Sequence, residues 1–151
     1  MIRQNNARQL EKAEFDARRM FTRILNVARL FMEVVDPDYE NHTARGILRT
    51  AHAGHGIVLA FDPHQGSIAL LMVLPTRAEL TMTRMIILLR LQNRTATRSS
   101  SITVDPESSA VRVNAHGLVP VANAVRPVVS AAFTDTIHVL EDDDFKQFII
   151  N

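Results

Sequence analysis

Apolar side chains recur every three or four residues along the first part of the chain, which is the spacing of one helix face. They stand at Leu10, Ala13, Ala17, Phe21, Ile24, Ala28, Phe31 and Val35. We therefore expect one long amphipathic helix from about Ala7 to Val35. The run Asp36-Pro37-Asp38 should end it, because a proline ring restricts the residue before it and removes a backbone donor.

The pattern changes to strands after a polar stretch. A short strand is expected near Gly46–His52, and two more apolar runs follow at Ile57–Phe61 and Ser67–Leu74. The letters DPHQG at 62–66 separate these two runs. They suit a tight turn, because proline presets φ, aspartate bonds back to the turn and glycine accepts a positive φ. The two runs therefore predict a hairpin.

A second hairpin repeats this logic from Ile102 to Ala115, with another Asp-Pro pair at its turn. Val111 and Val113 alternate with polar neighbours there, so one face of this hairpin should meet solvent. In the first hairpin, Ile57 and Leu59 share a face. If helices cover only one side of the sheet, the other side can hold a partner in extended conformation. Our candidates for partner-binding residues are Ile57, Leu59, Val111 and Val113.

A middle helix is expected from Pro75 to about Gln92, with Thr76 and Glu79 spaced as a capping box. Its apolar residues cover more than one face, so it should be buried from two sides. A single small sheet covers one stripe only, and the remaining stripe would form a large exposed apolar patch on a monomer. We therefore predict a homodimer. The expected interface residues are Met82, Met85, Ile86 and Leu89.

The C-terminal part predicts a third helix, roughly Val121 to Leu140, in which Pro127 is tolerable in the first turn or at a kink. The aspartates at 142–144 should cap a last short helix. The whole pattern predicts an α+β fold: an antiparallel sheet of about five strands with helices packed on it, in the order α-β-β-β-α-β-β-α. At 151 residues, the chain fits a single domain, 1–151.

Composition limits the classes of function. The sequence contains no cysteine, so disulfides and thiolate metal sites are excluded. The first residues are charged, and no apolar run approaches the roughly 20 residues that span a bilayer. These features favour a cytoplasmic protein without an export signal or membrane partner. The net charge of +1 gives no strong preference for an acidic or a basic partner.

Candidate chemistry is sparse. The chain has six histidines, but His52 and His55 lie among glycines and no HExxH motif occurs. The serines at 99–101 lack a nucleophile elbow, and the acidic run at 141–144 lacks the spacing of a calcium loop. We expect no catalytic residue, no cofactor and no metal. Accordingly, neither chelators nor pH should change the thermal midpoint much.

Arginines crowd the middle of the chain and raise the alternative of nucleic-acid binding through phosphate contacts. Their spacing does not form one stripe, and no aromatic residue lies among them for base stacking. The sequence therefore does not favour nucleic acid as a partner. These arginines are Arg77, Arg84, Arg90, Arg94 and Arg98.

The order of elements resembles that of the small homodimeric chaperones of bacterial type III secretion, in the class that serves single effectors, and the related YbjN-like domains. The resemblance is carried by SIALLMVLP at 67–75, LTMTRMIILLRLQN at 80–93 and ITVDPESSAVRVNAHGLVP at 102–120. In that family the middle helix ends in a leucine-rich stretch near an asparagine, and the next strand pair turns at Asp-Pro or a similar dipeptide.

The resemblance implies a bacterial cytoplasmic protein without a catalytic site. It implies dimers that pair through the middle helix and a neighbouring strand, and that hold the N-terminal segment of a secreted effector against apolar patches. The alternative within the same fold is a YbjN-like regulatory or nucleic-acid-binding domain. That alternative would gain support if the arginines of the middle helix shared one exposed surface.

Overall fold

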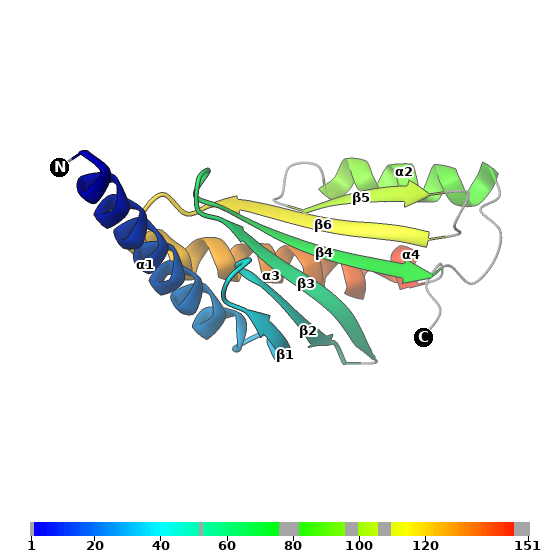
Figure 1. Ribbon diagram of the computed structural model, residues 1–151. Coiled ribbons are helices and arrows are strands. Elements are labelled where there is room, and N and C mark those ends of the chain that lie inside the picture. Colours follow the sequence, from blue (N-terminus) through cyan, green and yellow to red (C-terminus); the bar gives the residue numbers. More distant parts are fainter. Residues whose placement is uncertain (1, 52, 76–81, 96–99, 106–109, 147–151) are drawn as a thin grey trace.

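A six-stranded antiparallel sheet with helices on one face forms the body of the molecule (Figure 1). The computed structural model describes residues 2–51, 53–75, 82–95, 100–105 and 110–146. The strands are ordered β1-β2-β3-β4-β6-β5 across the sheet. The elements are α1 (Ile2–Ala28), β1 (Met32–Asp38), β2 (Thr43–Arg49), β3 (Gly54–Asp62), β4 (Ser67–Pro75), α2 (Met82–Thr95), β5 (Ser100–Asp105), β6 (Ala110–Leu118), the 3-10 turn η1 (Ala122–Ala124), α3 (Val125–Glu141) and α4 (Asp143–Lys146). The α+β fold class is confirmed, with one more strand than expected before α2.

The additional strand is β1, and it corrects the expected end of the first helix. α1 ends at Ala28, and after a short turn Met32–Asp38 forms an edge strand, so the helix does not continue to Val35. Pro37 is compatible with a strand here because β1 pairs with β2 alone, so the missing donor can face outward. The pairing register shifts between Val34 and Asp36, which marks a bulge.

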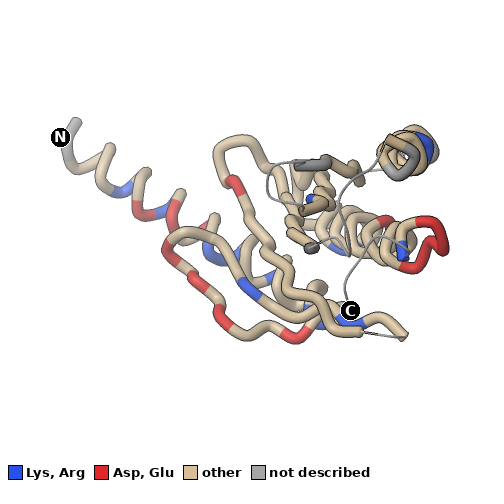
Figure 2. The backbone as a smooth tube through the Cα atoms, turned by 90° about the vertical axis from the view of Figure 1, so that its right-hand side faces the viewer, with Lys and Arg blue, Asp and Glu red and all other residues tan. Residues whose placement is uncertain are grey.

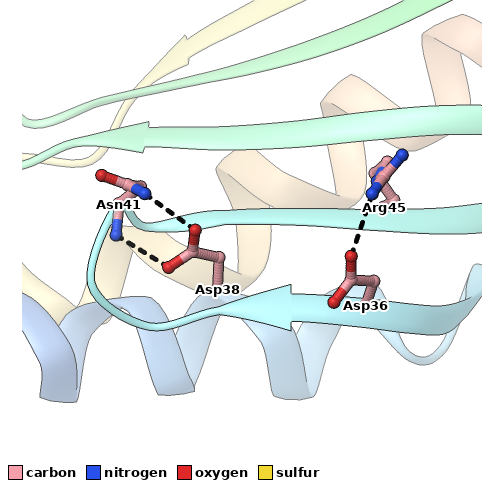
Figure 3. Close-up of polar contacts among 4 residues, drawn as sticks. All are labelled: Asp36, Asp38, Asn41 and Arg45. Atoms are coloured by element: carbon pink, nitrogen blue, oxygen red, sulfur yellow. Dashed lines mark hydrogen bonds and ion pairs between the residues drawn. The ribbon is translucent and has the colours of Figure 1, made fainter.

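Two exposed ion pairs join β1 to β2. Arg45 contacts Asp36 at 3.1 Å, as Figure 3 shows, and Arg49 contacts Glu33 at 3.4 Å. Because all four side chains are largely in solvent, each pair contributes at most about 1 kcal/mol. The pairs place charges along an edge strand, and such charges disfavour pairing with a foreign strand.

The predicted turn between β3 and β4 is confirmed. The backbone N–H groups of His64 and Gln65 donate to Oδ1 of Asp62, at 2.9 Å and 3.3 Å. Gly66 has φ +62°, the left-handed conformation that glycine adopts at little cost. Asp62 pairs with Ser67 directly across this turn.

The core lies between the sheet and the pair α1 and α3. α3 packs on β6, β4 and β5, and Phe133 of α3 stacks on Phe31 with ring centroids 5.1 Å apart. α3 begins at Val125 and not at Val121, so Pro127 is its third residue and occupies the first turn, one of the two positions considered for it. The predicted cap of the last helix is also present, since the N–H of Asp144 donates to Oδ1 of Asp142 at 3.0 Å.

Candidate partner-binding site

The first half of α1 extends beyond the end of the sheet (Figure 1). From Gln4 to Asp16 every side chain is exposed, and full burial begins only at Phe21. The second half of the helix is anchored in the core by Phe21, Ile24 and Leu25. An apolar helix face that leaves the body of the molecule in this way is available to another chain.

A hollow of about 580 Å³ lies under this overhang, and we call it the apolar groove. α1 forms one wall, the β3–β4 turn forms the other, and the segment after β6 closes it. Its lining is mostly apolar, with Glu14, Asp16 and two histidines among the polar members. The lining residues are Leu10, Ala13, Glu14, Asp16, Ala17, Met20, His42, Phe61, Pro63, His64, Gly66, Val119 and Pro120.

Gly66 ties two walls of the apolar groove together. The N–H of Val119 donates to the carbonyl oxygen of Gly66 at 2.6 Å, which joins the segment after β6 to the β3–β4 turn. A Cβ at position 66 would lie 3.2 Å from the oxygen of Val119, in addition to the strain of the positive φ. Glycine is thus required here by both conformation and space.

Gly66→Ala should therefore lower the free energy of unfolding by about 1–2 kcal/mol, the usual cost of left-handed backbone in a residue with a Cβ. Gly56→Ala is the matched control, because a Cβ at position 56 would meet nothing within 4 Å. Urea denaturation of the two variants measures the difference. Equal midpoints for both variants would contradict the role given to Gly66.

His42 stands at one end of the apolar groove in an unusual conformation. Its φ is +55°, and its carbonyl oxygen accepts the N–H of Phe61 at 2.8 Å. Its ring makes edge contacts with Phe21 and Phe61, with centroids 5.8 Å and 6.0 Å apart. The sequence predicts a loop for this residue and no role, because nothing in the local pattern indicates that two distant aromatic rings converge on it.

The turn that carries His42 is organised by Asp38 (Figure 3). Oδ1 of Asp38 accepts the N–H groups of Glu40 and Asn41 at 3.0 Å and 3.1 Å, and Oδ2 accepts Nδ2 of Asn41 at 2.8 Å. These bonds favour the carboxylate, the side chain of Asn41 most of all, so the pKa of Asp38 lies below its ordinary value.

A second hollow of about 560 Å³ adjoins the apolar groove, and we call it the acidic hollow. It lies between α1 and the β1–β2 turn, and it shares Glu14 and His42 with the apolar groove. Figure 2 shows acidic positions both on α1 and on the neighbouring β1–β2 hairpin. The lining residues are Glu11, Glu14, Phe15, Arg18, Tyr39, Glu40 and His42.

The four expected partner-binding residues lie elsewhere. Ile57, Leu59, Val111 and Val113 are at most 2% exposed and belong to the core under α1 and α3. The expectation that they lie on an open face is therefore wrong. Successive strand residues point to opposite sides, so the open face carries their neighbours. The exposed apolar residues of the sheet include Val58 on β3, which lies between Ile57 and Leu59, and Leu71 and Val73 on β4.

The middle helix shows the two-sided character expected of it. α2 contacts β5 and α4 and buries Leu88 and Leu91 against the body of the molecule. The four residues expected at a dimer interface lie on its other side and are between 36% and 81% exposed. They are Met82, Met85, Ile86 and Leu89.

Several residues that the sequence analysis named lie outside the residues that the structure describes. Thr76, Glu79 and His52 lie outside them, as do Arg77 and Arg98 and the side chains of Arg84 and Arg94. Of the five arginines named in the middle of the chain, only Arg90 has a described side chain, and it is exposed.

Within the described ranges, no three His, Asp or Glu side chains are grouped as metal ligands. The helices described there include none that is long and apolar enough to cross a membrane.

His55, on β3, is half-buried, and this burial lowers its pKa below the ordinary value of 6.5. The unfolded chain therefore takes up the proton first as the pH falls below about 7, and stability declines until the folded-state pKa is passed. The structure thus predicts a pH dependence that the sequence pattern did not indicate. His55→Gln should lose less stability than the wild type between about pH 7.5 and pH 5.5. Urea midpoints at the two pH values measure this. An equal decline in both proteins would contradict the expectation.

Comparison with known proteins gives a likeness of fold. No protein-family model matches the sequence, and no curated protein matches it. A chain in the crystal structure of the ExsC–ExsE complex aligns with a TM-score of 0.51 and 12% identity, over 83% of this chain and 91% of that one. A chain in the structure of the HopA1–SchA chaperone–effector complex aligns with a TM-score of 0.43 and 11% identity, over 70% of this chain and 77% of that one. On the first of these two likenesses, the fold is type III secretion chaperone-like, as the resemblance of the sequence implied.

Proposed function

We propose that this protein is a dimeric cytoplasmic chaperone of bacterial type III secretion, which binds the N-terminal segment of a secreted effector and keeps it competent for secretion. The observation that carries the proposal is the apolar groove. It is open to solvent between the overhanging half of α1 and the β3–β4 turn, and its lining is mostly apolar. An unfolded segment can bury apolar side chains there, and the likeness in fold supports this reading.

Dimerisation would proceed through the exposed face of α2. Met82, Ile86 and Leu89 lie on one side of this helix while Leu88 and Leu91 hold it to the body of the molecule. A two-fold axis beside α2 would bring the same apolar residues of two copies together. Two copies would then present two grooves to one partner chain, which raises its apparent affinity.

Leu89→Asp tests the dimer, with Leu30→Asp as control because Leu30 is another exposed leucine, in the turn that follows α1 and away from α2. Light scattering after size exclusion should give a dimer for the wild type and the control, and a monomer for Leu89→Asp. Circular dichroism should be the same for all three proteins. A monomeric wild type at micromolar concentration would refute the proposed dimer.

Site-specific crosslinking tests the binding function. A photoreactive phenylalanine analogue replaces Ala13, which lines the apolar groove, or Thr103, which is exposed on β5 away from it. After irradiation in the native host, the Ala13 variant should crosslink to the N-terminal segment of one secreted protein and the Thr103 variant should not. Crosslinks from Ala13 to folded protein surfaces alone would refute the function.

The alternative, a YbjN-like regulatory or nucleic-acid-binding domain, predicts a different outcome. Crosslinked nucleic acid, together with a salt-sensitive affinity that Arg90→Glu removes, would favour it over the chaperone. The described part of the chain gives this alternative one exposed arginine on α2, Arg90, and no shared arginine surface.

A further inference from the structure

We infer that the segment held in the apolar groove carries a lysine or arginine within a few residues of its large apolar anchor. This inference rests on the proposed function and specifies the partner. It follows from the acidic hollow that adjoins the groove along α1. The two hollows are not separate sites, because Glu14 and His42 belong to both linings.

The apolar groove selects the anchor. Phe61 forms part of its lining and is nearly buried, while Leu10 on α1 is exposed at its rim. A volume of about 580 Å³ accommodates one or two large side chains of the kind that usually dominate binding energy. Burial of such side chains contributes affinity without regard to charge.

The acidic hollow selects the charge beside the anchor. Its lining holds the three carboxylates of Glu11, Glu14 and Glu40 against the single guanidinium of Arg18. This excess of negative charge attracts a cationic side chain and repels an acidic one. The ring of Tyr39 also lines the hollow, and an aromatic face adds to the attraction for a cation.

Rigid positioning makes the pair of hollows a single recognition surface. His42 is fixed at their common wall by the backbone bond from Phe61 and by ring contacts with Phe21 and Phe61. Tyr39 is supported by Phe21, with centroids 5.7 Å apart. Residues of an extended segment advance about 3.3 Å each. A basic side chain one to three positions from an anchor in the apolar groove can therefore reach the acidic hollow.

The test uses synthetic fluorescent peptides of twelve residues, each with one phenylalanine and one leucine as anchors. Three sets differ only in the two residues that flank the anchors, which are lysine, glutamine or glutamate. Fluorescence anisotropy with the wild-type protein should give the tightest binding for the lysine set. We expect affinity about three- to tenfold above the glutamine set, as for one or two partly exposed charge pairs. The gain should shrink at high salt, where such pairs are screened.

A triple variant and its control assign this preference to the hollow. The triple variant removes three charges from the acidic hollow and should bind the lysine and glutamine sets equally. The control removes three exposed charges elsewhere and should keep the preference. The triple variant carries Glu11→Gln, Glu14→Gln and Glu40→Gln, and the control carries Glu33→Gln, Asp36→Asn and Glu141→Gln.

The outcomes separate the inference from the function on which it rests. Equal binding of all three peptide sets by the wild type would overturn the inference and leave the chaperone function standing. Failure of every set to bind would overturn both. A further variant, Ala13→Asp, should abolish peptide binding with the oligomeric state unchanged. If that variant instead dissociated a dimer, the groove would be assigned to a second copy of this chain, against the proposal.

Discussion

Leu59→Asp should abolish folding, whereas Val58→Asp should leave a folded protein. The two residues are neighbours on β3, and their side chains point to opposite faces of the sheet. Leu59 is 0% exposed under the helices, and Val58 is 37% exposed on the open face. The pair therefore tests which face of the sheet is the core.

The expected size of the effect follows from two costs. Loss of a buried leucine side chain usually costs about 2–5 kcal/mol, and burial of an unpaired carboxylate adds several more. Their sum approaches or exceeds the total stability of most domains, about 5–15 kcal/mol. Val58→Asp loses only part of a half-exposed contact and should cost about 1 kcal/mol or less.

Circular dichroism and urea denaturation measure both variants. The Leu59→Asp protein should lack a cooperative transition or fail to accumulate as soluble protein, while Val58→Asp should unfold cooperatively near the wild-type midpoint. A well-folded Leu59→Asp protein would show that this residue is not in the core. It would then restore Leu59 as a candidate for partner contact.

Phe21→Ala should lower the free energy of unfolding by about 3–5 kcal/mol, the usual cost of removing a buried aromatic ring. Phe21 is 0% exposed and is the first fully buried residue of α1, so it anchors the helix at the point where its overhang begins. The same ring supports Tyr39 and His42 at the wall between the two hollows. The variant should therefore also weaken peptide binding in the groove.

Phe15→Ala provides the control on the same helix. Phe15 is 60% exposed, and its described ring contact is with the guanidinium of Arg19, 5.7 Å from the ring centroid. Its removal should change the free energy of unfolding by about 0.5 kcal/mol or less. Urea denaturation of both variants gives the comparison, and similar losses in the two would show that α1 is anchored differently.

The elements predicted most accurately are those with local causes. The β3–β4 turn could be predicted from its own residues, because Asp62, Pro63 and Gly66 each have a conformational preference that acts within a few residues. The first turn of α3 at Pro127 and the cap at Asp142 are local in the same way. The missed strand β1 is different. Val34 and Val35 fit a helix stripe and a strand equally well, and pairing with the distant β2 decides between them.

The candidate site shows the same division between local pattern and tertiary structure. The alternation in β6 determined that Val111 and Val113 share one face, and the apolar surplus of α2 determined that part of this helix stays uncovered by its own sheet. Neither pattern states which face of the sheet receives α1 and α3, because SIALLMVLP is apolar on both sides. Only the tertiary structure decided that those valines are core. It also brought Phe21, Phe61 and His42 together from three separate segments, and long-range packing of that kind leaves no periodic trace in the chain.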